Sequence, residues 1–492
     1  MGVSAAGDTR LAHLALEESA QGKLAVDIIG KLRSETAVQT LVDAYDTGSN
    51  ELALAILRQI QQAVGSLPQT VPVHIRVRLR WQRLKKQLLE DQEALSLARS
   101  LLGLGAGVLM SLLLVFGFFS LPAAQMQDML LVPYPVSDIV TIVEVNDASL
   151  AQYGRWDQWP RSLHAQLVEQ LQAAGAETIV FDFVFEADTA NDALLAEAMA
   201  AAGNVVQPVL VQGDAFHDLE GRLRYEGVVL PQPELVTASA ALGHTGILHD
   251  EDGYIRRVPT LIAVEGRPYE SLAMAALSNY LGGGSAEKGE VENGRLSVAG
   301  RQIPVDEDGA MRIYYAGPPA EPGQTTFTTV PYQDVLAGTA PAELFRDKIV
   351  LVGITATAEP DRYLTPVSDG RPMYGVEILA NVIESIWSGR FIRVPGTAVS
   401  VLILLGLGLL VGLVCVRPVT GLVFALTIAG IYFLMVSTLF DVTGLMLNLY
   451  YPFTTIALSY LMVTAYRYSV EVRRRREILG LFASSVTPAV AQ

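Results

Sequence analysis

Three side chains that could hold a ligand lie close together after a β-rich segment. Trp156, Trp159 and Arg161 sit in and beside a loop that contains Gly154 and Pro160. Two indole rings and a guanidinium can stack on a ligand or clamp it through cation–π contact. The same residue types can instead fill the edge of a core and fix a turn, and we favour this structural alternative. The three residues remain candidates for ligand binding.

Two carboxylates follow segments that are predicted to be neighbouring strands. Asp147 and Asp182 each come at the end of such a segment. Ligands of open α/β sheets bind outside the carboxyl ends of the strands, and paired carboxylates can act as general acid and base. No His or Lys accompanies them at a suitable spacing, so capping or ion pairing is favoured over catalysis. We keep both as ligand-binding candidates and predict no catalytic residue.

A third group of polar residues has the composition of a metal site. His244 and His249 are followed by Asp250 and Asp252, and histidine and aspartate are zinc ligands. Asp252 also precedes a glycine in an ordinary turn signal, and no cysteine supports a closed site. We therefore predict no metal site.

A further charged pair, Asp361 and Arg362, precedes Thr365-Pro366 and predicts a local salt bridge and a turn. The sequence contains no nucleophile elbow, phosphate-binding loop or metalloprotease helix. An extracytoplasmic enzyme is therefore disfavoured.

Strand and helix signals alternate in the segment that carries these residues. Alternation of this kind predicts an α/β layer structure whose first portion is largely parallel. A glycine-rich tract from Gly282 to Gly294 predicts an exposed loop. Strands are expected at Ile139–Val145, Thr178–Phe185, Asn204–Val211, Val258–Val264, Met311–Tyr315 and Ile349–Gly353, and helices at Leu163–Ala174, Asp192–Ala202 and Val376–Ser388.

Four apolar runs flank this segment, one before it and three after it. Each has the length of about 20 residues that crosses a bilayer as a helix, so we predict a membrane protein with four transmembrane α-helices. The predicted regions are a helical cytoplasmic region (1–97), helix one (98–121), an α/β sensor (122–393), helices two to four (394–416, 420–439, 445–466) and a cytoplasmic linker (467–492).

Charge predicts the orientation of these spans. Basic residues precede the first span and follow the last, and Arg417 lies between spans two and three. Because Lys and Arg accumulate on the cytoplasmic side, both termini are expected in the cytoplasm and residues 122–393 outside. Arg390 and Arg393, beside span two, count mildly against this topology. The outer segment holds 37 Asp and Glu against 17 Lys and Arg, which disfavours nucleic acid as a partner.

The amino-terminal region has apolar residues at helical spacing, interrupted at Thr47–Asn50. It predicts a single HEAT-like helical hairpin, which is either a module for a cytoplasmic protein partner of residues 1–97 or a helical cap on the anchor. A basic helix over Val73–Leu89 then suits topology and anionic lipid headgroups. The one cysteine, Cys415, excludes an intrachain disulfide.

Small residues recur within the first two spans. Gly103 and Gly107, and likewise Gly408 and Gly412, are four residues apart and so share a helix face. Such faces allow close helix packing in lipid, either in a homodimer or between spans one and two; glycine is also simply frequent in membrane helices. After span four, a run of arginines predicts a stop-transfer anchor on a continuous helix that could carry a signal: Arg473, Arg474, Arg475 and Arg476.

An ordered series of short motifs resembles the CHASE domain, type 2, an extracellular sensor associated with cyclases and histidine kinases. The resemblance covers roughly residues 135–392 and extends through the three following spans. It rests on Val145-Asn-Asp147, Gly154-Arg-Trp156, Trp159-Pro-Arg161, Phe181-Asp182, Leu242-Gly-His244, Arg256-Arg-Val-Pro259, Val350-Leu-Val-Gly353 and Gly375-Val-Glu377, among others.

The resemblance implies a cytoplasmic output domain and a multi-pass inner-membrane location with a periplasmic sensor. Residues Ile478–Ala483 and Val486–Pro488 look like the linker before a class III nucleotide cyclase. We expect truncation before an adenylate or guanylate cyclase that works as a homodimer and uses ATP or GTP with Mg²⁺; this chain itself is expected to hold no cofactor. The alternatives are a sensor for a histidine or Ser/Thr kinase and a stand-alone scaffold. The stimulus stays open, and a small molecule or a peptide is expected.

Overall fold

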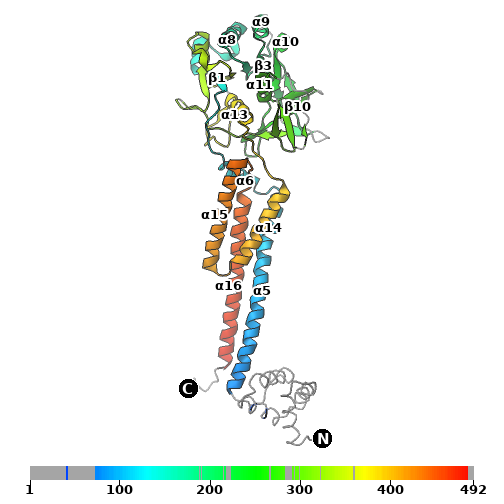
Figure 1. Ribbon diagram of the computed structural model, residues 1–492, viewed down its shortest axis with the longest axis vertical. Coiled ribbons are helices and arrows are strands. Elements are labelled where there is room, and N and C mark those ends of the chain that lie inside the picture. Colours follow the sequence, from blue (N-terminus) through cyan, green and yellow to red (C-terminus); the bar gives the residue numbers. More distant parts are fainter. Residues whose placement is uncertain are drawn as a thin grey trace. The chain divides into compact units, whose positions relative to one another are not determined.

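The computed structural model describes residues 40, 42 and 73–485, apart from 188, 190, 214, 218–222, 265–266, 283–290, 293, 299, 322 and 358–360 (Figure 1). The predicted HEAT-like hairpin and most of the glycine-rich tract lie outside these residues. The chain divides into the units Met1–Leu101 and Leu102–Gln492, and the contacts described below lie within the second unit.

A seven-stranded sheet organises the α/β domain, which we define as residues 130–392. Its order is β16-β1-β17-β2-β3-β7, and neighbours along this path are parallel. Strand β6 pairs antiparallel with the far end of β3. The strands are β1 (Val140–Val145), β2 (Thr178–Phe181), β3 (Val205–Gln212), β6 (Gly227–Val229), β7 (Ala241–His244), β16 (Thr328–Pro331) and β17 (Ile349–Ile354).

Helices cover both faces of this sheet (Figure 1). Alternate residues of a strand point to opposite faces, so Ile142 and Val143 of β1 enter two different cores. Covering on both faces explains why the central strands β1, β2 and β17 are buried along almost their whole length. One face carries α8 (Arg161–Ala173), α9 (Asp192–Ala202) and α12 (Tyr332–Leu336), and the other carries α11 (Leu272–Tyr280) and α13 (Gly375–Ser388).

Short elements complete the domain, and all the strands named among them pair antiparallel. The helical ones are α7 (Asp147–Tyr153), η1 (Trp156–Gln158), α10 (Pro233–Ala238) and η2 (Ala342–Leu344). The strands are β4 (Phe216–His217), β5 (Leu223–Arg224), β8 (Leu248–His249), β9 (Ile255–Pro259), β10 (Leu261–Val264), β11 (Arg267–Glu270), β12 (Val291–Glu292), β13 (Arg295–Val298), β14 (Arg301–Pro304), β15 (Ala310–Arg312), β18 (Arg362–Tyr363) and β19 (Met373–Tyr374).

The mixed α/β class agrees with the sequence prediction, and three predicted strands differ in extent. β2 ends at Phe181, because Asp182 leaves the sheet and the phenylalanines after it turn into an aromatic cluster. The strand predicted over Val258–Val264 is divided at Thr260, whose hydroxyl and backbone NH both bond to the Gly309 carbonyl. The strand predicted over Met311–Tyr315 ends at Arg312, after which α13 side chains bind the backbone.

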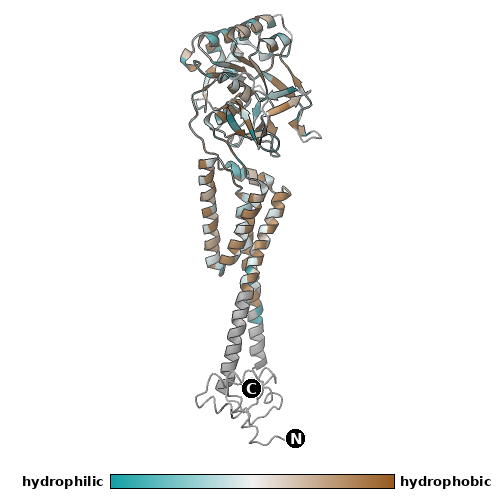
Figure 2. Ribbon diagram, turned by 45° about the vertical axis from the view of Figure 1, so that its right-hand side comes forward, coloured by the Kyte–Doolittle hydropathy of each residue, from teal (hydrophilic) through white to brown (hydrophobic). Residues whose placement is uncertain are grey.

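Three helical segments among the described residues are long and apolar enough to cross a membrane: Ala94–Val115, Thr397–Val414 and Pro418–Thr443. They belong to α5 (Val73–Val115), α14 (Thr397–Val414) and α15 (Pro418–Thr443). Figure 2 shows α14 and α15 in brown over most of their length. These apolar helices indicate membrane association.

The helices of the first and fourth apolar runs are shorter at one end than hydropathy predicts. α5 ends at Val115 rather than Leu121, and Phe119 has a left-handed backbone (φ 67°) before α6 (Ser120–Asp128). α16 (Tyr450–Ser485) begins five residues later than the predicted span, because Arg393 bonds to the backbone of Gly444 and Met446 and so holds the chain extended. α16 then continues through Arg473–Arg476.

The four glycines of the first two spans lie against one another within one chain. A Cβ atom on Gly103 would clash with the backbone of Gly408 and touch Gly412, and one on Gly107 would clash with the Leu404 carbonyl. Ser459 of α16 donates a hydrogen bond of 3.4 Å to the Gly103 carbonyl. Of the two arrangements that the spacing allowed, the structure contains packing of α5 against α14.

Candidate functional site

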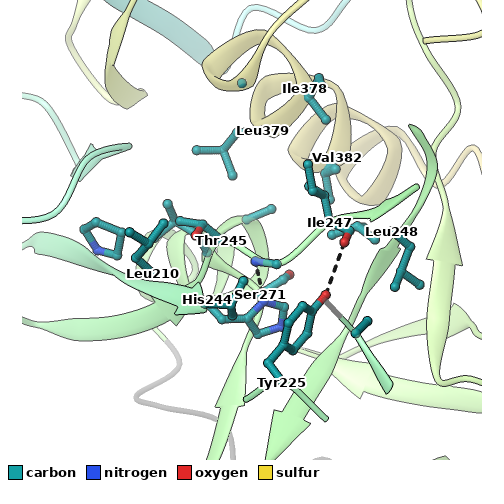
Figure 3. Close-up of a pocket in the computed structure, with 18 of the residues that line it drawn as sticks. Leu210, Tyr225, His244, Thr245, Ile247, Leu248, Ser271, Ile378, Leu379 and Val382 are labelled. Atoms are coloured by element: carbon teal, nitrogen blue, oxygen red, sulfur yellow. Dashed lines mark hydrogen bonds between the residues drawn. The ribbon is translucent and has the colours of Figure 1, made fainter. Parts of the chain in front are cut away.

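A cavity of about 810 Å³ lies at the carboxyl ends of β17, β2, β3 and β7 (Figure 3). This is the edge at which open α/β sheets bind ligands, and the volume suits a small molecule. Much of the lining is apolar, and Leu210, Ile378, Leu379 and Val382 are labelled in the figure. The last three belong to α13, which forms one wall of the cavity.

His244 ends β7 and lines the cavity while being only 1% exposed. The Gly246 backbone NH donates to its Nδ1 atom over 3.0 Å (Figure 3), so the ring proton of the neutral form is on Nε2. Burial lowers the pKa of His244 to about 3, and the nearby Thr260 backbone opposes this shift only in part. The Nε2 atom makes no hydrogen bond of normal geometry among the described residues, and the Thr260 backbone is the polar group that acts on it.

Tyr225 and Thr245 add polar atoms to the same region of the lining. The Tyr225 hydroxyl donates to the Ile247 carbonyl over 3.2 Å (Figure 3). The Thr245 hydroxyl is buried and has no partner in the described part of the chain. An apolar cavity with a few placed polar atoms is the usual form of a small-molecule site.

Asp182 and Asp361 bring two carboxyl groups to the cavity. Burial raises the pKa of Asp182 well above its usual value, and the charge of Asp361 raises it further. Burial also raises the pKa of Asp361, against hydrogen bonds from Tyr363 and the Gly375 backbone. The Oδ2 atom of Asp182 is buried and lacks a hydrogen-bond partner in the region that is described. The two carboxyls therefore resist being charged together.

Gly375, the first residue of α13, makes room for Asp361. A Cβ atom at this position would clash with the Asp361 carboxylate. The Gly375 NH lies at the start of a helix, where negative charge is favoured, and it donates to the Asp361 backbone carbonyl over 3.3 Å. Sequence reasoning predicted a salt bridge between Asp361 and Arg362, but Arg362 bonds to the Thr357 carbonyl, and Asp361 belongs to the cavity.

Arg257 carries positive charge into another part of the cavity lining, together with Asp308 and His217. Its guanidinium pairs with Asp306 and Asp308 at 2.8 Å each and with Asp250 at 3.5 Å. These carboxylates raise the pKa of Arg257 against the effect of burial. Its charge is thus matched within the protein.

The two tryptophans that were predicted as ligand-binding candidates lie outside this cavity lining. Trp156 packs on Phe183 with ring centroids 4.4 Å apart, and Trp159 is 5% exposed and donates to the Gly154 carbonyl. Both contact His164, which is 1% exposed and bonds to the Tyr332 hydroxyl at 2.9 Å. They fill an aromatic core, and Phe183 joins that core to the cavity.

Arg161 and Asp147 also lie outside the lining. Arg161 pairs with Asp192 at 2.9 Å, and its guanidinium stacks over Phe185. Asp147 is exposed and accepts hydrogen bonds from the Thr357 NH and hydroxyl, which lower its pKa. Of the five predicted ligand-binding residues, the structure brings Asp182 to the cavity.

The residues of the considered metal group have separate partners. Asp250 and Asp252 both bind Arg256, at 2.9 and 2.8 Å. His249 packs its ring against Tyr363. No group of three or more metal-ligating side chains is found within the described residues.

The helix that forms the cavity wall also holds the chain segment that faces the membrane helices. Asn381 of α13 accepts from the Ala316 NH at 2.8 Å, and Ser385 bonds to both the NH and the carbonyl of Tyr314. The Tyr314 ring packs with residues of α15 and of the segment before α16 in a buried cluster. One helix thus contacts both the cavity and the junction with the membrane helices.

A sheet of this kind, with a cavity at its carboxyl edge and apolar helices on either side in sequence, defines a membrane-associated α/β protein. Residues 105–414 match the model of the CHASE2 domain, and the chain belongs to this family. CHASE2 is an extracellular sensor domain of signalling proteins. The matched region includes the end of α5 and the whole of α14. No curated protein and no solved structure matches the chain.

Proposed function

We propose that this chain is the sensory and transmembrane part of a receptor in which a small molecule entering the cavity regulates a cytoplasmic output domain. The observation that carries this proposal is the double role of α13. Ile378, Leu379 and Val382 line the cavity, whereas Asn381 and Ser385 hold the Tyr314–Ala316 segment. A ligand that moves this helix changes the contact with α15.

The energy that such a receptor requires is small. A ligand that prefers one of two packings by about 1–3 kcal/mol shifts the equilibrium between them 5- to 150-fold. α13 is packed along both sides, against the sheet and against α11, so it moves as a rigid element rather than bending residue by residue. The backbone pairing of Arg393 with Gly444 and Met446 provides a second connection from the domain to the α15–α16 turn.

We propose four spans with both termini in the cytoplasm of a cell whose inner membrane holds the protein, and the α/β domain outside. In this proposal α16 is the fourth span. Its first turns carry polar tyrosine, threonine and serine side chains, but Thr455 and Ser459 are buried within the helix bundle and so do not face lipid. Its exposed arginines beyond the apolar part, Arg473, Arg475 and Arg476, fit the cytoplasmic side.

Labelling on intact cells tests this topology. In a Cys415→Ser background, Glu186→Cys in the α/β domain and Arg475→Cys on α16 are both exposed positions. A membrane-impermeant maleimide should label the first and reach the second only after the cells are opened. Labelling in the opposite order would refute the orientation.

The output domain that we propose is a class III adenylate or guanylate cyclase acting as a homodimer. This extension rests on the resemblance of residues 478–488 to a cyclase linker and on the continuous helix α16 that leads to it. A kinase output is the main alternative, and a scaffold that recruits a protein through residues 1–97 is another. The coding sequence after Gln492 distinguishes them, and the chain ending at Gln492 should form no cyclic nucleotide.

Filling the cavity tests the sensory role without knowledge of the ligand. Leu379→Trp should displace α13 and change amide hydrogen exchange at Tyr314–Ala316 and along α15. The matched control is Leu194→Trp, which alters an exposed leucine of α9 on the opposite face of the sheet. With the native downstream sequence present, output should change at least about 5-fold for Leu379→Trp. Unchanged exchange and unchanged output would contradict the proposal.

A further inference from the structure

The carboxyl pair in the cavity has no matching positive charge. Asp182 and Asp361 line one cavity and act electrostatically on each other. Tyr363 and the Gly375 NH stabilise Asp361, whereas the Oδ2 atom of Asp182 has no hydrogen-bond donor among the described residues. A buried carboxylate oxygen in this condition is costly unless something donates to it.

The cations around the cavity are already matched or are neutral. Arg257 is the one Lys or Arg among the described lining residues, and three carboxylates share its charge. His244, 1% exposed in the same lining, is neutral because burial lowers its pKa to about 3. The Oδ2 atom of Asp182 is therefore the unpaired polar atom of the lining that a bound cation would satisfy.

We propose that the cavity binds a small organic cation, an amine with an apolar body, whose ammonium group bonds to the carboxyls of Asp182 and Asp361. This inference rests on the proposed sensory function and adds the chemical class of the ligand. The ammonium supplies up to three N–H donors, of which one reaches the Oδ2 atom of Asp182. Its charge relieves the repulsion between the two carboxylates.

The rest of the cavity suits the body of such a molecule. Ile378, Leu379 and Val382 provide an apolar wall, and Tyr225 and Tyr363 bring aromatic rings of the kind that attract cations. The Thr245 hydroxyl, which is buried without a partner in the described part of the chain, provides a polar atom for a hydroxyl or carbonyl of the ligand. A metal ion is a poorer fit, because no set of three metal-ligating side chains occurs in the described part of the chain.

Protons compete with the amine for the same carboxyls. The titratable and charged lining groups are Asp182, Asp361, Tyr363, His244, Tyr225, His249, Arg257, Asp308 and His217. Since burial raises the pKa of both Asp182 and Asp361, the pair holds a proton well above the usual range. Binding of an amine releases that proton to solvent, and affinity should therefore rise with pH until the pair is fully ionised or the amine itself loses its charge.

The test uses three probes of similar size and different charge on the full chain in lipid nanodiscs. Isothermal titration calorimetry compares 2-phenylethylamine with 2-phenylethanol and 3-phenylpropanoate. The amine should bind at least about 10-fold more tightly than either. Asp182→Asn and Asp361→Asn should each weaken amine binding about 10- to 100-fold, the loss of a charge-assisted hydrogen bond. Asp157→Asn is the matched control, since it removes an exposed carboxylate that is paired with Arg155 outside the cavity lining, and it should change affinity less than about 3-fold.

The remaining outcomes show whether the proposed ligand class, the proposed sensory role or both are wrong. Equal binding of alcohol and amine, or amine binding that Asp182→Asn leaves unchanged, would overturn the cation. If the alcohol binds and Leu379→Trp removes it, the cavity is still a ligand site and only the chemical class is wrong. If no probe binds, the cation proposal fails; the sensory proposal then fails with it only if Leu379→Trp also leaves hydrogen exchange at Tyr314–Ala316 unchanged.

Discussion

Tyr314 of the α/β domain stacks on Phe440 of α15, with ring centroids 5.5 Å apart and an interplanar angle of 11°. Tyr314 is held from behind by Ser385 of α13, and Tyr134 packs edge-on against its ring at 5.3 Å. The Arg390 guanidinium lies over both tyrosines. Arg390 counted mildly against the predicted topology. Its charge thus has two aromatic partners at the junction with the membrane helices.

The Tyr314–Phe440 stack should couple the two parts of the protein energetically. A double-mutant cycle with Tyr314→Leu and Phe440→Leu, measured by thermal unfolding in nanodiscs, should give a coupling of about 0.5–1.5 kcal/mol. Tyr314→Leu should also suppress the effect of Leu379→Trp on hydrogen exchange in α15. Tyr153→Leu is the control, because Tyr153 packs on Trp159 in the core on the opposite face of the sheet from α13. Additive single effects would show that the stack carries no coupling.

Asp182→Asn should stabilise the protein near neutral pH. Asp182 has a raised pKa in the folded state, so between the unfolded value of about 3.9 and the folded value the native state binds more protons. Stability then falls as pH rises through this window and stays reduced above it. The neutral amide of Asp182→Asn does not titrate and so removes this loss. The free energy of unfolding at neutral pH, measured by thermal unfolding, should rise by about 1–3 kcal/mol, and it should differ little from that of the unchanged protein below the unfolded pKa. A gain that is independent of pH would contradict this assignment.

The secondary structure could be predicted largely from local patterns, because the strands at Val140, Val205 and Ile349 are apolar runs bounded by glycine and polar residues. The break after Val115 could not, since Phe116, Phe118 and Phe119 are as apolar as the span itself. Only the left-handed conformation of Phe119 and the start of α6 show that the membrane helix has ended.

The site was predictable only in part, because local patterns locate the end of a strand but not the residues that the fold brings beside it. The position of Asp182 at a strand end marks the correct edge of the sheet. Its partner Asp361 comes close only because β2 pairs with β17 and the start of α13 packs on the end of β17. The same limit applies to Trp156 and Trp159. Their residue types fit either a ligand clamp or a core, of which the core was favoured, and their packing on His164 and Phe183 shows that they belong to the core.

Arg256 should be the most sensitive charged residue of the domain. Its side chain is 4% exposed and binds Asp128 of α6, Asp250 and Asp252 at 2.8–2.9 Å. Arg256→Met leaves three partly buried carboxylates without their cation and should cost about 3–5 kcal/mol. Arg257→Met, in the neighbouring and more exposed residue, should cost less, and thermal unfolding compares the two. Equal losses would argue against a special role of the Asp128 contact.

The backbone contact between α5 and α14 leads to the last prediction, which distinguishes close helix packing from mere glycine frequency. Gly103→Leu and Gly408→Leu place side chains where a Cβ atom already meets the opposite backbone, so the helices must separate and lose the Ser459 bond to the Gly103 carbonyl. Gly105→Leu and Gly406→Leu are matched controls, because nothing lies within 4 Å of a Cβ atom at either position. We expect the first pair to lose about 1–3 kcal/mol of unfolding free energy, the usual cost of overpacking, and the second pair to lose less than about 1 kcal/mol, measured by thermal unfolding in nanodiscs.

Since the clash between Gly103 and Gly408 is within one chain, the loss should not depend on protein concentration. A loss that disappears on dilution would instead place the glycines between two copies of the protein.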